Sequence, residues 1–490
     1  MRRIVMGNYA VPESIRAYRP KGTIIKKIAG HFYVYEYSKE KTIDGKWRNK
    51  SGRLIGSIVE GQGYIPNSNL LCDAEISTVE FGDYAVSLAN SRKTLSLLES
   101  CFNKTDAIRI YAIALIHFTQ GFVHMKDISI CYEMSYLSLL WPGLKLGYDA
   151  LEKLYDQLGR RQGGVLQLEE RLIQASSRQV AIDGHVIGSG SAENDLTEKG
   201  YKFWKLGEAQ INLLMAYDVN TGMPLLSRIY EGGSTDGVSV KDLFQQVKLQ
   251  KMLFIVDRGF YSAENLELFT RDGNAYIIPL RKNHKACQQA VSRLDMQSRF
   301  IYQKGRKGSL IECKDDMIDG QRILTFRDVD EATAEQTNYL RHIGNGDRSY
   351  TQEAFEQAKD YMGVIVLQTS ISDKSPQEIY TLYKKRWQIE TFYDYFKNRL
   401  GCKALGQQDY YKTQGLAFLM LVESLIHHEF EEASRAVQGF SVQDCLLHAR
   451  MVKADKRHGS WCVANCIPRQ QRLFKKLNTP LTVSVNEFVT

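Results

Sequence analysis

Five short runs rich in β-forming residues, all between residues 179 and 280, restrict the possible folds of this chain more than any other feature. They are QVAIDGHVI (179–187), QINLLMAYDV (210–219), MPLLSRIYEG (223–232), KMLFIVDRGF (251–260) and NAYIIPL (274–280). A segment with helical periodicity, Ser239–Val247, lies before the fourth run. Three strands in near succession, then a helix and two more strands, predict an α/β fold with a mixed sheet.

The order of these elements matches that of the ribonuclease-H-like fold. The next helix of that fold is not expected directly after Leu280. Residues 281–360 instead carry glycine-containing hairpin signals, which predict a β-rich insertion. A buried strand at Tyr361–Ser370 and a long helix that begins near Pro376 are expected to complete the core.

At 490 residues the chain is long enough for several domains. We expect an α/β multidomain protein with six segments. They are a β-rich N-terminal segment (1–80), a helical region (81–165), the first part of the ribonuclease-H-like core (166–280), the β-rich insertion (281–360), the second part of the core (361–436) and a C-terminal tail (437–490).

The two N-terminal segments each leave two interpretations open. A loop expected at Asp44–Gly52, between two strands, exposes Trp47 with several Lys and Arg residues; it either contacts nucleic acid or is a solvated turn, which is commoner. Helices are expected at Ala107–Val123, Met125–Met134 and Leu146–Gly159. They suit either a helix-turn-helix that places one helix in the major groove or a plain helical bundle.

Charge and hydropathy narrow the class of protein. Lys and Arg total 64 and Asp and Glu total 56, and the net charge of +8 slightly favours polyanionic partners. No apolar run reaches the roughly 18–20 residues of a membrane helix, and the first residues lack the apolar stretch of a signal peptide. Nine cysteines without regular spacing favour a reducing compartment. We expect an intracellular protein with no membrane partner.

The most informative stretch is YKKRWQIETFYDYFK, residues 383–397. On an α-helix, at about 100° per residue, Tyr383, Arg386, Glu390 and Lys397 lie within an arc of about 60°; we call these four residues the polar stripe. Its basic groups can hold phosphate oxygens while its carboxylate binds a divalent cation. Arg386 and Glu390 also have the spacing of an ordinary surface ion pair. The fixed spacing of four residue types favours the functional interpretation.

Two aspartates supply further carboxylates. Asp183 lies in the apolar run VAID and Asp257 ends the run LFIVD. One interpretation is that each aspartate simply marks the point where a strand enters water, which is common. Alternatively, if the first and fourth strands are neighbours in the sheet, the two aspartates lie side by side at one edge. Two like charges at that distance repel, and a bound divalent cation removes the repulsion. With Glu390 they make three carboxylates, which suits a site for two Mg²⁺ ions, with Mn²⁺ as a substitute.

These residues resemble a known family. The polar stripe resembles the tyrosine-arginine-glutamate-lysine signature of bacterial DDE transposases of the insertion-sequence-four family. DRGFYSAENL (257–266) is similar to that family's signature around the second aspartate, and Asp183 in AIDGH resembles the first. A β-rich insertion before the glutamate is also typical of the family. The resemblance is strong over about Gln179–Lys403 and looser at Ile58–Asn67.

The resemblance implies a DNA transposase that cuts at the terminal inverted repeats of its own mobile element and joins the 3′ ends to target DNA. It implies that Asp183, Asp257 and Glu390 are catalytic and bind the metal ions, and that Tyr383, Arg386 and Lys397 position DNA phosphates. Double-stranded DNA would be the partner, a homodimer would hold both ends, and the protein would be cytoplasmic and associated with the nucleoid. Two alternatives stay open: a ribonuclease-H-like nuclease or resolvase, and a DNA-binding derivative without catalysis.

Some features depart from the family or stay ambiguous. His185 stands where relatives often have Thr or Ser, and the insertion contains no tryptophan that could hold a flipped base. Four more basic residues either contact the DNA backbone or are solvated: Arg258, Lys304, Arg306 and Lys307. The C-terminal Cys and His residues fit no standard zinc spacing, which favours incidental core cysteines; they are Cys445, His448, His458, Cys462 and Cys466.

Overall fold

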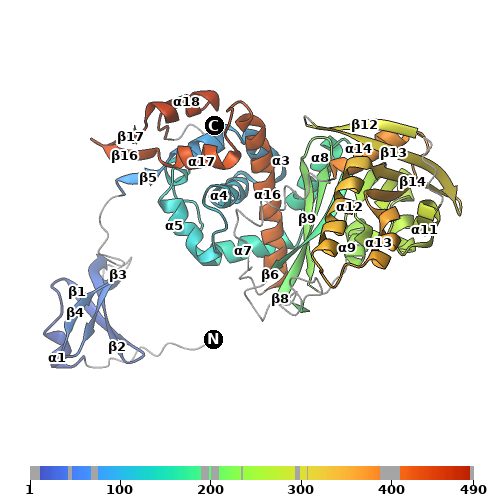
Figure 1. Cartoon of the computed structure of the whole chain (residues 1–490). Coiled ribbons are helices and arrows are strands. Elements are labelled where there is room, and N and C mark those ends of the chain that lie inside the picture. Colours follow the sequence, from blue (N-terminus) through green and yellow to red (C-terminus); the bar gives the residue numbers. More distant parts are fainter. Residues whose placement is uncertain are drawn as a thin grey trace. The chain divides into compact units, whose positions relative to one another are not determined.

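The computed structural model in Figure 1 divides into two compact units, residues 1–77 and 78–490. The described residues are 11–41, 47–67, 76–188, 198–199, 209–232, 236–292, 298–305, 307–386 and 409–485.

The N-terminal unit is a small antiparallel sheet. Helix α1 (Glu13–Arg16) is followed by β1 (Thr23–Ile28), β2 (His31–Lys41), β3 (Trp47–Val59) and β4 (Gly63–Pro66), which pair in that order. Its buried core consists of Ile15, Val34 and Ile58, with half-buried apolar neighbours. Trp47–Gly52, which we expected in a loop, instead belongs to β3 and pairs with the end of β2. The alternation of side chains was too weak there to identify a strand, because polar residues occupy both faces.

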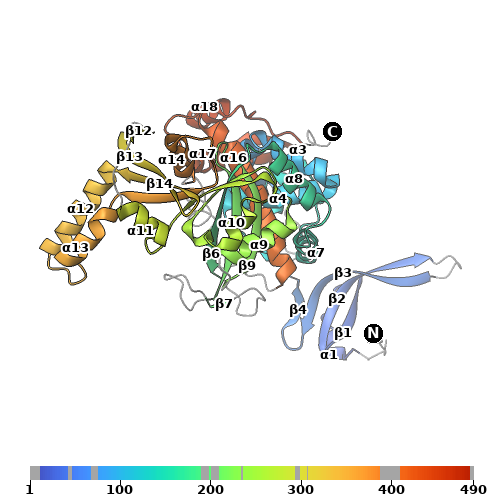
Figure 2. The same ribbon diagram turned by 90° about the vertical axis from the view of Figure 1, so that its right-hand side faces the viewer.

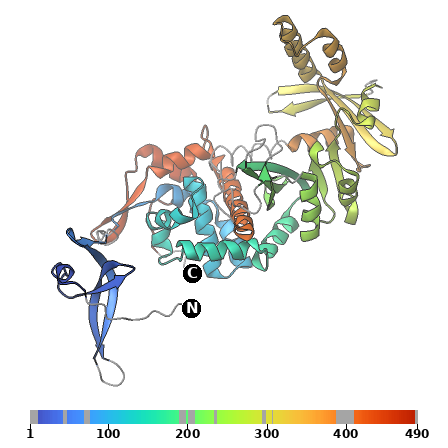
Figure 3. The ribbon, with the colours of Figure 1, turned by 90° about the horizontal axis from the view of Figure 1, so that it is seen from below.

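The second unit has a helical part built around two buried helices, α4 and α16. Its helices are α2 (Gly82–Ala89), α3 (Arg92–Cys101), α4 (Lys104–Gln120), α5 (Ile128–Glu133), α6 (Leu137–Leu140), α7 (Tyr148–Gly159), α8 (Gly164–Ala175), α16 (Tyr410–Ser434), α17 (Val442–Arg450) and α18 (Pro468–Lys476). Asn103 caps α4 by accepting a hydrogen bond from the Asp106 amide. Figure 3 shows α16 between the other helices and the sheet. The three helices expected in this region correspond to α4, to α5 with the short 3₁₀ helix Met125–Asp127 before it, and to α7. Because α4 is buried at nearly every position from Ala107 to Thr119, it does not present a face to DNA.

The rest of the unit is organised on a large mixed sheet, as the predicted α/β class requires. Its strands are β6 (Gln179–Gly188), β7 (Glu198–Lys199), β8 (Ala209–Asp218), β9 (Pro224–Glu231), β10 (Leu253–Val256), β11 (Ala275–Pro279), β12 (Ser298–Lys304), β13 (Lys307–Ile318), β14 (Gln321–Asp328) and β15 (Val364–Thr369). The central order is β9-β8-β6-β10-β11-β15-β14-β13-β12. Strands β6, β10 and β11 are parallel, whereas β8, β9 and β15 run antiparallel to their neighbours.

Residues 281–360 extend this same sheet and also contain helices. Strands β12, β13 and β14 continue the sheet beyond β15, and Figure 2 shows α12 (Val329–Gly344) and α13 (Gln352–Ala358) projecting from them. A helix does follow Leu280, contrary to our expectation: α11 (Lys285–Ser292). Its small residues Ala286, Cys287, Ala290 and Val291 pack with β13, β14 and β15. Eight residues are too few for this periodicity to stand out in the sequence.

The C-terminal segment is folded into the second unit and is not the tail that we expected. Strand β16 (Lys453–Arg457) pairs with β17 (Ser460–Ala464) on one side and with β5 (Thr78–Glu80) on the other. Lys453 forms an ion pair with Glu80 across this contact. A strand pairing across more than 370 residues leaves no local pattern, so the sequence could not reveal it.

Candidate active site

The structure places two of the predicted site residues at adjacent positions of neighbouring parallel strands, at the carboxyl end of β10 and in the middle of the longer strand β6. Val256 of β10 pairs with Ile182 of β6, and the next residues along the two strands are Asp257 and Asp183. The backbone of Asp257 is still extended, with φ −82° and ψ 163°, so it continues the line of β10. Neighbouring strands lie about 4.7–4.9 Å apart. Both aspartates are half-buried.

Asp183 is held on a central strand. β6 lies between β10 and β8, and Asp183 pairs with the buried Met215 of β8. Its carboxylate oxygen Oδ1 accepts a hydrogen bond from the amide of Gly184 at 3.0 Å. His185, two residues further along the same strand, is half-buried. Strand alternation puts the side chains of Asp183 and His185 on one face of the sheet.

Asp257 is fixed by the tight turn that follows it. The amide of Phe260 donates to the carbonyl of Asp257 at 3.0 Å, and the Phe260 ring is completely buried. The carbonyl of Phe260 in turn accepts from Asn265 Nδ2 at 3.0 Å, while Ser262 caps α10 (Ala263–Leu268) through the Asn265 amide. Asn265 was not among the residues predicted from the sequence. The only local indication of its role is its position three residues after the capping residue Ser262. Arg258, beside the aspartate, is exposed.

Helix α14, which contains the first residue of the polar stripe, begins where the sequence predicted. In α14 (Pro376–Lys385), Ser375 and Glu378 form a capping box, with the Glu378 amide donating to Ser375 Oγ at 3.3 Å. Tyr380 packs its ring against Phe300, Tyr302 and Phe326 of β12 and β14, with centroids 4.9–5.6 Å apart. These aromatic contacts anchor the helix on the strands of the insertion.

Two residues of the polar stripe are described, and they lie next to each other. Arg386 ends α14, and its guanidinium carbon lies 5.8 Å from the centroid of the Tyr383 ring, a cation–π distance. Beside them, Lys385 Nζ donates to Asn220 Oδ1 at 2.7 Å in the turn between β8 and β9. The other two members of the stripe, Glu390 and Lys397, lie outside the described residues.

Two of the basic residues singled out in the insertion, Lys304 and Lys307, lie at the end of one hairpin. Lys304 at the end of β12 pairs with Lys307 at the start of β13. Lys307 is exposed, and its Nζ lies 3.7 Å from a carboxylate oxygen of Asp330 in α12. Arg306 and the side chain of Lys304 are outside the description.

The two aspartates have the donor chemistry that a hard divalent cation requires, since carboxylate oxygens are the ligands that Mg²⁺ prefers. In the part of the chain that the structure describes, no group of three or more His, Cys, Asp or Glu side chains is arranged to hold a metal ion. This finding also covers the C-terminal set. There Cys445 is buried, Cys462 is exposed and His448 packs its ring against Phe440, in keeping with the interpretation as incidental residues.

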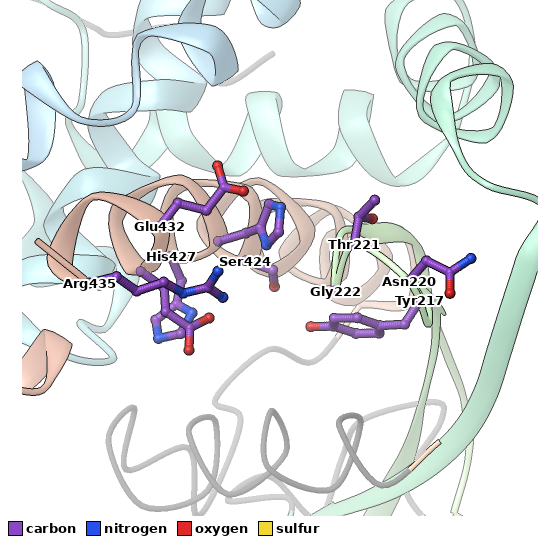
Figure 4. Close-up of a pocket in the computed structure, with 10 residues that line it drawn as sticks. Tyr217, Asn220, Thr221, Gly222, Ser424, His427, Glu432 and Arg435 are labelled. Carbon is purple, nitrogen blue, oxygen red and sulfur yellow. The ribbon is translucent and has the colours of Figure 1, made fainter. Parts of the chain in front are cut away.

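A separate pocket of about 440 Å³ lies between α16 and the turn that joins β8 to β9. Figure 4 shows side chains of α16, among them His427, Glu432 and Arg435, together with Tyr217 and Asn220 from the other side. Among the predicted site residues that the structure describes, none lines this pocket.

Comparison with known proteins identifies the family. Residues 174–421 match the family described as the transposase DDE domain, which covers half of the chain. No curated protein sequence matches. A solved structure titled as a cryo-EM structure of the piggyBac transposase synaptic complex with hairpin DNA is similar at 11% identity and a TM-score of 0.38, over 76% of this chain and 77% of that one. A TM-score of this size does not establish a shared fold.

Within the described ranges, no helix combines the length and the apolar character needed to cross a bilayer. The family match includes the strands that carry Asp183 and Asp257, as well as α14. Enzymes of this family cut and join DNA and generally use divalent metal ions. The chain belongs to the transposase DDE domain family and is a DNA transposase.

Proposed function

We propose that Asp183, Asp257 and Glu390 form the acidic site of this transposase and hold two Mg²⁺ ions. The observation that carries the proposal is the position of Asp183 and Asp257, one residue beyond a paired position of two parallel strands. Two half-buried carboxylates this close repel each other unless a cation lies between them. Glu390 is the carboxylate of the polar stripe, four residues after Arg386, and would supply the third ligand group.

We further propose that the catalytic core is ribonuclease-H-like and is interrupted by residues 281–360. The strand order β9-β8-β6-β10-β11 supports this, because three antiparallel-connected strands are followed by α9 (Asp236–Gln246) and by two strands parallel to the first. The polar stripe and the DRGFYSAENL motif support membership of the insertion-sequence-four group within the family.

The reaction that we propose has two steps at each element end. Water attacks the phosphodiester at the terminal inverted repeat and the 3′ oxygen leaves; the freed 3′-hydroxyl then attacks a phosphodiester of the target DNA. When bound, Mg²⁺ would help to ionise the attacking hydroxyl and stabilise the leaving oxygen. Tyr383, Arg386 and Lys397 would contact the phosphates beside the cut and fix their orientation. Element ends occur in pairs, so a homodimer is the simplest assembly; binding to chromosomal DNA would place it at the nucleoid.

The test uses duplex DNA that carries the inverted repeats flanking the coding region. Asp257→Asn and Glu390→Gln should each reduce Mg²⁺-dependent cleavage by at least a hundredfold while DNA binding stays within about twofold. Asp319→Asn, an exposed aspartate in the turn between β13 and β14 where Asn also accepts the positive φ, is the matched control and should cleave like the wild type. Unchanged cleavage by Asp257→Asn would overturn the assignment.

A second assay separates strand transfer from simple hydrolysis. Pre-cut ends with a free 3′-hydroxyl are supplied with supercoiled target DNA, and joined products are measured. A transposase joins the ends, whereas a nuclease or resolvase with the same acidic site leaves them unjoined.

A further inference from the structure

The N-terminal unit carries most of the net positive charge of the chain. Residues 1–77 contain thirteen Lys and Arg against seven Asp and Glu, which gives +6 of the total of +8. The remaining 413 residues are therefore almost neutral on balance. A charge surplus confined to one small unit is the electrostatic footprint of a surface that binds a polyanion.

This unit also has a two-stranded extension. β1 pairs with β2 only over residues 31–36, and β4 pairs with β3 only over residues 56–59. Beyond these partners β2 and β3 continue together, from the pair Tyr37 and Ser51 to the pair Lys41 and Trp47. We call residues 37–41 and 47–51 the arm. Figure 2 shows it as a ribbon that projects from the sheet.

No arm residue whose side chain is described belongs to the core of the unit. The buried residues Ile15, Val34 and Ile58 all lie outside the arm. A two-stranded ribbon by itself is only marginally stable in water. The arm therefore adds little to the stability of the unit, which points to a role in binding. At its end the Trp47 side chain is 68% exposed, so its indole is available to a partner.

The composition of the arm fits nucleic acid. It contains Lys39, Lys41, Arg48 and Lys50 against one acidic residue, Glu40. Its two strands are about 4.7–4.9 Å apart, and a two-stranded β-ribbon fits the major groove of B-DNA, which is about 12 Å wide. In that position the lysines and the arginine meet phosphates at the groove edges, and the exposed indole can contact base edges or thymine methyl groups.

We propose that the arm binds double-stranded DNA by entering the major groove, with its basic residues on the phosphates. The inference rests on the transposase acting on DNA, and it assigns a surface for DNA that is separate from the acidic site. The partner is a duplex and not a single strand, because the arm is a ribbon with a single exposed indole and offers no series of rings on which successive bases could stack.

The experiment measures the affinity of the full-length chain for duplex DNA as a function of salt. Lys39→Ala/Lys41→Ala should lower the magnitude of the slope of log K against log salt by about 1.8, because each lost phosphate contact contributes about 0.9. Lys475→Ala/Lys476→Ala, two exposed lysines at the end of α18, removes the same charge and should leave the slope unchanged. Trp47→Ala should weaken binding severalfold with an unaltered slope.

Three outcomes would overturn the proposal. One is an equal change of slope in the two double-lysine variants, since net charge alone would then explain it. Another is an unchanged slope in Lys39→Ala/Lys41→Ala. The third is an effect on single-stranded DNA only. The experiment separates this proposal from that of the acidic site. Asp257→Asn should lose cleavage and keep DNA binding, whereas the arm variants should lose affinity and still cleave at saturating DNA concentration.

Discussion

Asp257 lies one residue beyond the pairing partner of Ile182, so that it and Asp183 occupy the same level of two parallel strands. The arrangement places two half-buried aspartates at adjacent positions of paired strands. A rigid pair of this kind has a cost in the absence of a cation, because like charges directly opposite each other in a sheet destabilise it.

This repulsion predicts a stability effect that does not depend on catalysis. Without divalent ions, Asp183→Asn should be more stable than the wild type by about 0.2–1 kcal/mol, because the repulsion is removed. Added Mg²⁺ should raise the melting temperature of the wild type, since a ligand that binds only the native state stabilises it, and should leave Asp183→Asn unchanged. Thermal unfolding with and without Mg²⁺ measures both effects.

The control for this prediction is Asp319→Asn, which should respond to Mg²⁺ like the wild type. An equal rise in melting temperature for Asp183→Asn would mean that Mg²⁺ binds elsewhere, and the carboxylate pair would then have no role in holding it.

Much of the catalytic part could be predicted from the sequence because its signals are local. The runs at 179–187 and 251–260 are short and β-rich, and each contains one aspartate. Residues at the same level of two neighbouring parallel strands lie beside each other, and this predicted that Asp183 and Asp257 meet. Strands β6 and β10 do pair in parallel, with Val256 opposite Ile182. The Ser375 capping box and Pro376 likewise fixed the start of α14.

Other features could not be predicted because they depend on distant partners. The pairing of β5 with β16 joins residues 78–80 to 453–455 and has no signature in either segment. The buried residue Arg228, in β9, has its partner Glu169 on helix α8, so no local pattern of the strand accounts for it. Trp47–Gly52 was mistaken for part of a loop because its pairing with the end of β2 depends on a partner strand and not on a local apolar pattern.

The ion pair between Arg228 and Glu169 predicts a large loss of stability when it is broken. Arg228 donates to both carboxylate oxygens of Glu169, at 2.6 and 2.8 Å, and Arg161 donates to the same carboxylate at 2.9 Å. Burial opposes ionisation, but the two guanidinium groups hold the pKa of Glu169 below its ordinary value. Glu169→Gln leaves two buried cations without their counterion and should reduce the free energy of unfolding by about 3–5 kcal/mol.

Urea unfolding measures this loss, and the neighbouring residue provides the control. Glu170 is exposed on the same helix, so Glu170→Gln should change the free energy of unfolding by no more than about 0.5 kcal/mol. Equal effects of the two substitutions would show that the buried network contributes nothing beyond a surface charge.

Helices α7 and α16 are in close contact at two glycines, Gly159 and Gly415. Replacement of either glycine by alanine is therefore expected to destabilise the fold. A Cβ on Gly415 would lie 2.0 Å from the carbonyl oxygen of Tyr155, and one on Gly159 would lie 1.7 Å from the carbonyl oxygen of Tyr411. The obstacles are backbone atoms, so the helices must separate. Gly415→Ala should therefore cost about 1–3 kcal/mol or more in unfolding free energy.

The matched control is Gly344→Ala at the end of α12, where an added Cβ meets no atom within 4 Å. It should be neutral or stabilising by up to about 1 kcal/mol, because alanine restricts the unfolded chain. Chemical denaturation of both variants decides the matter; equal stability of Gly415→Ala and the wild type would contradict close contact between the two helices.

His117 predicts how stability depends on pH. This histidine is completely buried in α4, and its Nε2 lies 3.2 Å from the carbonyl oxygen of Val123. Burial lowers the pKa of His117 to about 4, whereas the unfolded chain titrates near 6.5. Between these values the unfolded state binds more protons than the native state, so stability falls as the pH is lowered from 6.5 towards 4. The loss from this one residue should amount to about 3 kcal/mol.

Unfolding free energies measured from pH 7 to pH 4 test this contribution. His117→Gln keeps an N–H donor for Val123 but cannot take up a proton, so its stability should fall less steeply over this range than that of the wild type. His458→Asn removes an exposed histidine at a position with φ of 49°, which Asn tolerates, and should retain the wild-type slope. If His117→Gln and His458→Asn gave the same pH profile, protonation of His117 would not limit the acid stability of the fold.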